Sequence, residues 1–71
     1  MSKTTLEKFG ENVREERLKQ GFSQEELAAR AGVHRTYIGM IERAEKNITL
    51  ENIEKVAKAL KLNINELLTF K

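Results

Sequence analysis

The 71-residue chain contains neither cysteine nor proline, and only 6% of its residues are aromatic. Without disulfides, a stable core has to come from helix packing, with dimerisation as a further source of buried surface. The lack of cysteine also fits the reducing cytoplasm. No apolar run approaches the roughly 20 residues needed to span a bilayer, and the N-terminal segment MSKTTLEKFGEN lacks the apolar core of a signal peptide. We therefore expect a soluble, cytoplasmic protein without a membrane partner.

Neither sign of charge dominates the sequence. The 13 basic and 11 acidic residues leave a net charge of +2, with a pI near 9.1. This balance permits binding to nucleic acid without requiring it. Whether the chain has a surface for nucleic acid therefore depends on where the charges lie. Many acids lie within residues 7–16 and 51–54, whereas residues 34–40 contain one arginine and no acid.

Apolar residues recur at helical spacings along the chain, and no segment shows the alternation of a strand. The first helix is expected to follow Thr4, whose partner Glu7 lies at the spacing of a capping box, and to run to Gln20. Gly10 within this helix indicates either close packing against a neighbour or a tolerated weakness. Two further helices are expected at 50–60 and 64–70, where they would complete the core and support dimerisation.

Residues 24–43 contain two short helical patterns joined by a glycine. Ser23 and Glu26 have the spacing of a reciprocal capping box, so a helix is expected to begin near Gln24. Gly32 can adopt a left-handed backbone and turn the chain, while Val33 points inward between the two helices. The helix that begins near Gln24 presents an apolar face formed by Leu27, Ala28 and Ala31. This pattern predicts a helix-turn-helix, within one all-α domain of five helices over residues 1–71.

The second of these helices has two different faces. Ile38 and Ile41 define a buried side, whereas Arg35, Gly39 and Arg43 follow one another at four-residue steps on another side, beside Thr36 and Met40. A helix in the major groove of DNA needs such a face, because arginine can bind O6 and N7 of guanine while threonine and methionine can contact the thymine methyl. The alternative is a solvated helix face in a helical bundle.

The sequence resembles the Cro and CI-type repressor family, which has the lambda-repressor-like fold. The matching residues are Gln24, Leu27, Ala28, Gly32, Val33, Ile38 and Ile41. More narrowly, HRTYIGMIER followed by EKNITLENIEKVAKAL is similar to the controller proteins of restriction-modification systems, many of which carry Arg-Thr-Tyr at the start of the recognition helix. That resemblance implies regulation of its own promoter and of a neighbouring endonuclease gene. Stand-alone phage and chromosomal repressors share much of the same pattern.

We expect base reading by Arg35, Thr36, Met40 and Gly39 on double-stranded DNA. Gly39 departs from the polar residue often found at its position, so it either allows close approach to the DNA or leaves one base pair unread. Contacts to the DNA backbone are expected from Gln24, Ser23, His34, Tyr37, Arg43, Lys46 and Asn47.

Three residues in or near this set allow more than one interpretation of their role: Tyr37, His34 and Ala44. Tyr37 has core packing as its alternative role. His34 is interpreted as an N-cap or a phosphate neighbour. Ala44 replaces the glycine that many relatives have after Glu-Arg, which puts a left-handed end of this helix, and the direction of Lys46, in doubt.

Two charged residues are directed toward the core. Arg17 extends the apolar stripe of the first helix by one turn, and Glu42 extends the stripe of Ile38 by one turn. Because an unpaired buried charge costs several kcal/mol, we expect Arg17 and Glu42 to form a structural ion pair. The repressor family has such a pair at the matching positions. The alternative is that each side chain reaches water by itself.

A single reading helix covers few base pairs, so we expect a homodimer on a two-fold symmetric operator. The apolar C-terminal residues form the predicted dimer interface, with completion of the monomer core as the alternative: Leu62, Ile64, Leu67, Leu68 and Phe70. The sequence therefore predicts a transcriptional regulator that acts by occupying promoter DNA or by contacting RNA polymerase there.

Other functions are less consistent with the sequence. An antitoxin-like protein-interaction module on the same scaffold is the alternative to a DNA-binding regulator. We can place no paired carboxylates, metal-ligand cluster, nucleophile with a base or phosphate-cradling loop in one cleft. We therefore expect no enzyme activity, no cofactor and no metal site.

Overall fold

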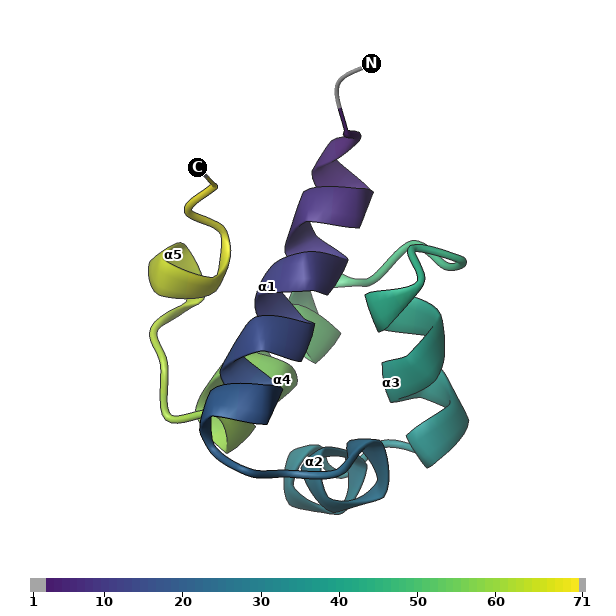
Figure 1. Cartoon of the computed structure of the whole chain (residues 1–71), viewed down its shortest axis with the longest axis vertical. Coiled ribbons are helices and arrows are strands. Elements are labelled where there is room, and N and C mark those ends of the chain that lie inside the picture. The colour runs from purple at the N-terminus through teal and green to yellow at the C-terminus, as the bar shows by residue number, and fades with distance from the viewer. Residues whose placement is uncertain (1–2, 71) are drawn as a thin grey trace.

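The computed structural model describes residues 3–70 and is all-helical over that range (Figure 1). Its five helices are α1 (Thr5–Lys19), α2 (Gln24–Ala31), α3 (Arg35–Glu42), α4 (Leu50–Ala59) and α5 (Ile64–Leu67). The predicted all-α fold class is therefore confirmed. Among the described residues, no helix is long and apolar enough to cross a membrane.

The helices pack around one apolar core. In Figure 1, α1 runs between α3 and α5 and contacts both, while α2 lies at one end of the molecule against α3 and α4. The side chains that are fully buried come from all five helices or their ends: Val13, Leu27, Ile38, Ile41, Val56, Leu60 and Leu67. Because α2 and α3 share this core with α1, the whole framework holds the outer face of α3 in one orientation.

The predicted helix starts are present, with one difference in detail. Thr4 and Glu7 form the reciprocal capping box at the start of α1, and the Glu7 backbone and side chain both bond to Thr4. At α2 only half of the predicted box forms: the Glu26 N–H donates to the Ser23 hydroxyl over 3.0 Å. The Glu26 carboxylate instead lies 3.7 Å from Arg30 one turn later. The Ser23 half is sufficient to begin α2 at Gln24.

Gly10 marks a close approach of the α1 and α3 backbones. A Cβ atom at this position would lie 3.0 Å from the Glu42 carbonyl oxygen and would overlap the Ile41 carbonyl oxygen. Both neighbours are main-chain atoms of α3, which cannot rotate away as a side chain can. Of the two sequence interpretations, close packing is the one that the structure supports.

Residue Ala44 ends α3 in the left-handed conformation, although it is not glycine. Its φ is 57°, compared with 72° at Gly32 after α2. The Ala44 N–H donates to Ile41 and the Glu45 N–H donates to Met40, which together satisfy two carbonyls at the helix end. The replacement of the usual glycine therefore leaves the helix end unchanged, at the cost of backbone strain.

Helix α5 is shorter than predicted and ends at Leu67. The Thr69 hydroxyl donates to the Asn65 carbonyl over 2.6 Å, in place of the backbone N–H that would continue the helix. The Asn12 amide on α1 donates to the carbonyls of Leu67 and Thr69 over 2.9 and 3.0 Å. The same contact fastens the C-terminal segment to α1.

The prediction that Leu67 lies on a dimer interface is wrong. Its side chain is completely buried in the core of the monomer, because α5 points it between α1 and α4. The other four residues of the predicted interface are half-buried against the core: Leu62, Ile64, Leu68 and Phe70. The most exposed large apolar side chain is instead Leu50, at 70%, which the sequence analysis did not select.

Candidate functional site

An open cleft lies between the N-terminal turn of α2 and the outer face of α3. It is lined by Arg17, Ser23, Gln24, Glu25, Arg35, Thr36, Gly39 and Arg43. Six of these eight residues are among those that the sequence predicted to contact DNA. The cleft is therefore the place where the structure brings the predicted site together.

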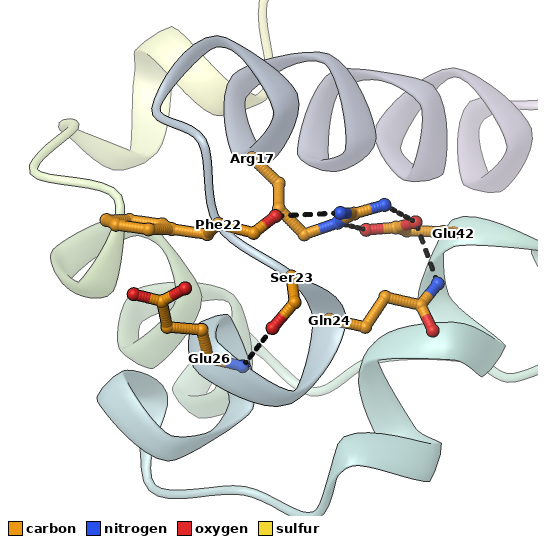
Figure 2. A network of polar contacts seen from close by, with 6 residues as sticks. All are labelled: Arg17, Phe22, Ser23, Gln24, Glu26 and Glu42. Atoms are coloured by element: carbon orange, nitrogen blue, oxygen red, sulfur yellow. Dashed lines mark hydrogen bonds and ion pairs between the residues drawn. The ribbon is translucent and has the colours of Figure 1, made fainter.

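Arg17, which lines the cleft, forms a buried ion pair with Glu42 (Figure 2). The Arg17 Nε donates to one Glu42 carboxylate oxygen over 2.6 Å, and the Arg17 Nη2 donates to the other over 3.0 Å. A third guanidinium N–H donates to the Phe22 carbonyl over 2.9 Å. The predicted pair between Arg17 and Glu42 therefore forms in the bidentate geometry that favours it. This hydrogen bonding raises the pKa of Arg17 above its ordinary value, against the opposing effect of burial.

Gln24 joins the same network from the first turn of α2. Its side-chain amide donates to Glu42 over 3.1 Å (Figure 2). The carboxylate thus accepts bonds from α1 and α2 while it belongs to α3, so one charged group connects three helices. No buried side-chain polar atom among residues 3–70 lacks a hydrogen-bond partner.

Arg35 and Thr36 form the exposed first turn of α3. His34 is the N-cap, and its Nδ1 accepts a hydrogen bond from the Thr36 N–H over 3.2 Å. The Arg35 guanidinium lies 3.1 Å from the carboxylate of Glu25 on α2. Sequence analysis missed this contact, because the two residues are ten positions apart and belong to different helices, so no helical spacing indicates it.

Gly39, which was expected either to allow close approach to the DNA or to leave one base pair unread, lies beneath the Arg43 side chain. Gly39 is buried, because the Arg43 side chain folds back over it from the next turn of α3. A Cβ atom at residue 39 would lie 3.0 Å from an Arg43 guanidinium nitrogen and 3.5 Å from the Gln24 side chain. With no side chain of its own, Gly39 makes room for the Arg43 guanidinium, which covers its surface in this structure.

Arg43 in turn contacts Glu45, with 2.9 Å between Nε and the carboxylate. This bond raises the pKa of Arg43 and holds the pKa of Glu45 below its usual range. Both side chains are more than half exposed. Arg43 therefore occupies the cleft as a charged but already partnered group.

Several predicted residues lie outside the cleft. Tyr37 is half-buried, and its hydroxyl accepts a hydrogen bond of 3.0 Å from the side chain of Asn52 on α4, so it packs at the edge of the core. Met40 is half-buried, while Lys46 and Asn47 are exposed in the loop after α3. Asn47 borders a separate apolar hollow beside Phe9 and Leu68. The sequence gives no signal for the contact between Asn52 and Tyr37, because the two residues belong to different helices.

The geometry of α2 and α3 agrees with the comparison to known families. Residues 13–67 match the helix-turn-helix family. The chain belongs to that family. Its helix-turn-helix consists of α2, the turn at Gly32 and the recognition helix α3.

Relatives place the chain more narrowly within the helix-turn-helix family. It is 51% identical over 63 residues to the control protein C.BamHI of Bacillus amyloliquefaciens, covering 87% of this chain and 78% of that protein. The crystal structure of the restriction-modification controller protein C.AhdI from Aeromonas hydrophila superposes with a TM-score of 0.86 at 47% identity, covering 87% of this chain and 94% of that one. The biofilm regulator SinR, solved in complex with DNA, has a TM-score of 0.81 at 34% identity, covering 86% and 98%.

Proposed function

We propose that the protein is a transcription regulator that binds a two-fold symmetric DNA operator as a homodimer in the cytoplasm. One observation carries this proposal: Arg35 and Thr36 are exposed side by side on the first turn of α3, while the rest of that helix is held by the core. A recognition helix contacts base edges through its N-terminal residues, so this is the turn that enters the major groove. The similarity to SinR, which was solved with DNA, supports the same placement.

Within this proposal the two walls of the cleft have different roles. Arg35 presents two parallel donors to O6 and N7 of a guanine, and Thr36 contacts a neighbouring base. The N-terminal turn of α2 directs free backbone N–H groups at a phosphate, with Ser23 and Gln24 beside it. Arg43 and Lys46 add positive charge along the DNA backbone, which sets the register of the protein on its site.

The dimer surface is proposed to lie where α4 begins and α5 packs beside it. Leu50 and Ile64 border one shallow hollow, together with Glu51 and Glu54. Leu50 is 70% exposed and shares this hollow with the half-buried Ile64, so the two side chains form one apolar area at the surface. A second copy would cover this leucine and place two recognition helices about 34–36 Å apart on one face of the duplex.

We further infer that the protein controls a restriction-modification system. C.BamHI is a control protein and C.AhdI is a restriction-modification controller, and both are about half identical to this chain over most of their length. Control would act at a promoter, either by excluding RNA polymerase or by contacting it there. A promoter reporter read with and without the protein separates these two modes, since exclusion lowers transcription and contact raises it.

The test is selection of bound duplexes from a random library at physiological salt, with the wild type, Arg35→Ala and Arg14→Ala. Arg14 is an exposed arginine on α1, away from the cleft, and serves as the matched control. The wild type and Arg14→Ala are expected to select the same two-fold symmetric motif. Arg35→Ala is expected to lose preference at one base pair in each half and roughly 1–3 kcal/mol of binding free energy. A wild type that enriches no motif, or an unchanged motif in Arg35→Ala, would refute the proposal.

A further inference from the structure

Both exposed arginines of the cleft already have a carboxylate partner in the free protein. Glu25 lies 3.1 Å from Arg35, and Glu45 lies 2.9 Å from Arg43. All four side chains are more than half exposed. Water screens such pairs, so their contribution to the stability of the fold is small.

These two pairs differ from most of the other exposed pairs. The pairs of Lys19, Arg30, Lys55 and Lys58 each join residues three or four apart within one helix, and the pair of Lys3 with Glu11 lies on α1 away from the cleft. The pair between Glu25 and Arg35 instead crosses from α2 to α3 at the mouth of the cleft. Glu45 lies just beyond the end of α3 and is directed back at Arg43, which itself folds back over Gly39. Both carboxylates therefore neutralise arginine charge on the surface assigned to DNA.

A carboxylate in this position opposes DNA binding in two ways. The arginine has to leave the carboxylate before it can contact DNA, and the carboxylate then remains close to phosphates of the same charge. On DNA of arbitrary sequence, the arginine would replace a carboxylate by one phosphate oxygen, which is a similar partner. On the operator, Arg35 would gain both acceptors of a guanine in a geometry that excludes water. The carboxylate therefore weakens binding to the operator less than it weakens binding to DNA of arbitrary sequence.

We propose that Glu25 is a specificity-determining residue that holds Arg35 away from non-operator DNA, and that Glu45 lowers the affinity of Arg43 for DNA of any sequence. This inference rests on the proposed function. Glu42 does not share the role, because its carboxylate is buried beneath the cleft, where it binds Arg17 and Gln24. An arginine that is already neutralised also releases fewer ions when it meets DNA, so each acidic residue lowers the salt dependence of non-specific binding.

The experiment measures binding of Glu25→Gln, Glu45→Gln and the double variant by fluorescence anisotropy. One probe is a duplex of random sequence, and the other is a short duplex that carries the single motif selected by the wild type. Each titration is repeated over a range of salt concentrations. Glu11→Gln is the matched control, because Glu11 is an exposed partner of Lys3 on the surface of α1 and lines neither the cleft nor the proposed dimer surface. It changes the net charge equally.

Glu25→Gln and Glu45→Gln are each expected to bind random DNA about threefold to fivefold more tightly than Glu11→Gln. For Glu25→Gln, the affinity for the selected duplex is expected to rise less, so the ratio of the two affinities falls. Glu45→Gln is expected to gain equally on both duplexes. The slope of log affinity against log salt on random DNA should steepen by up to about 0.9 for each arginine released. The melting temperatures of the three single variants should agree, which separates this role from a structural one.

Two results would overturn the inference while leaving the proposed function intact. If Glu11→Gln strengthens binding to random DNA as much as the cleft variants do, the effect is one of net charge only. If Glu25→Gln gains equally on both duplexes, the Glu25 carboxylate lowers affinity without setting specificity. A wild type that binds neither duplex would overturn the proposed function, and this inference with it.

Discussion

Replacing Glu42 by alanine removes the carboxylate that three helices share. The Glu42 and Arg17 side chains are only 3% and 10% exposed, and the substitution leaves the arginine with the Phe22 carbonyl as its remaining partner. Removing one member of a buried pair costs about 3–5 kcal/mol. A chain of 71 residues has a total stability of roughly 4–10 kcal/mol at typical values per residue. Glu42→Ala should therefore remove a third or more of the stability and lower the melting temperature by at least about 12 °C.

Thermal and urea denaturation followed by circular dichroism measure this loss. Glu11→Ala is the control, because Glu11 is 48% exposed on α1 and its partner Lys3 is also exposed, so a change within about 0.5 kcal/mol is expected. The double variant Arg17→Met with Glu42→Leu should regain most of the lost stability, since it leaves no buried charge without a partner. If Glu42→Ala and Glu11→Ala have the same melting temperature, the reasoning that Arg17 and Glu42 form a buried, interdependent pair is refuted.

Two substitutions test the close approach of α1 to α3 at Gly10 and the left-handed backbone of Ala44 after α3. Gly10→Ala should destabilise the protein by roughly 1–3 kcal/mol in urea denaturation, although alanine favours helices, because the new Cβ meets the carbonyls of Ile41 and Glu42. A stabilised variant would contradict the close approach. Ala44→Gly should stabilise by about 1 kcal/mol, because φ at this residue is 57° and glycine adopts that value without strain. A lower unfolding midpoint would show that Ala44 contributes more through packing than it costs in strain.

The features that could be predicted from the sequence are those with a local or periodic signal. Thr4 and Glu7 lie three residues apart, so the start of α1 follows from their spacing alone. Arg17 and Glu42 could be paired because each extends an apolar stripe into the core, where a lone charge is costly. The same stripes identify Ile38 and Ile41 as core residues, and both are fully buried.

Other features depend on contacts between helices that have no signal of this kind. The spacing of Gly39 places it on the outer face of α3, but only the folded position of Arg43 shows that this face is covered there. Leu67 is completely buried because α5 turns it toward the core, whereas Leu50, in the first turn of α4, is 70% exposed, and the apolar character of the two residues does not distinguish them. The pair between Glu25 and Arg35 depends on the angle at which α2 meets α3.

The close approach at Gly10 also limits how the protein can adapt to DNA. Main-chain atoms of α1 and α3 touch there, and the Arg17–Glu42 bonds fasten the same two helices a short distance away. With two such attachments the recognition helix has no hinge of its own, so tilting or sliding it would have to carry α1 along. Any induced fit to an imperfect operator is then confined to exposed side chains and to the angle between two subunits. A half-site of the wrong shape has to bend to meet this protein, because the reading helix cannot shift to meet it.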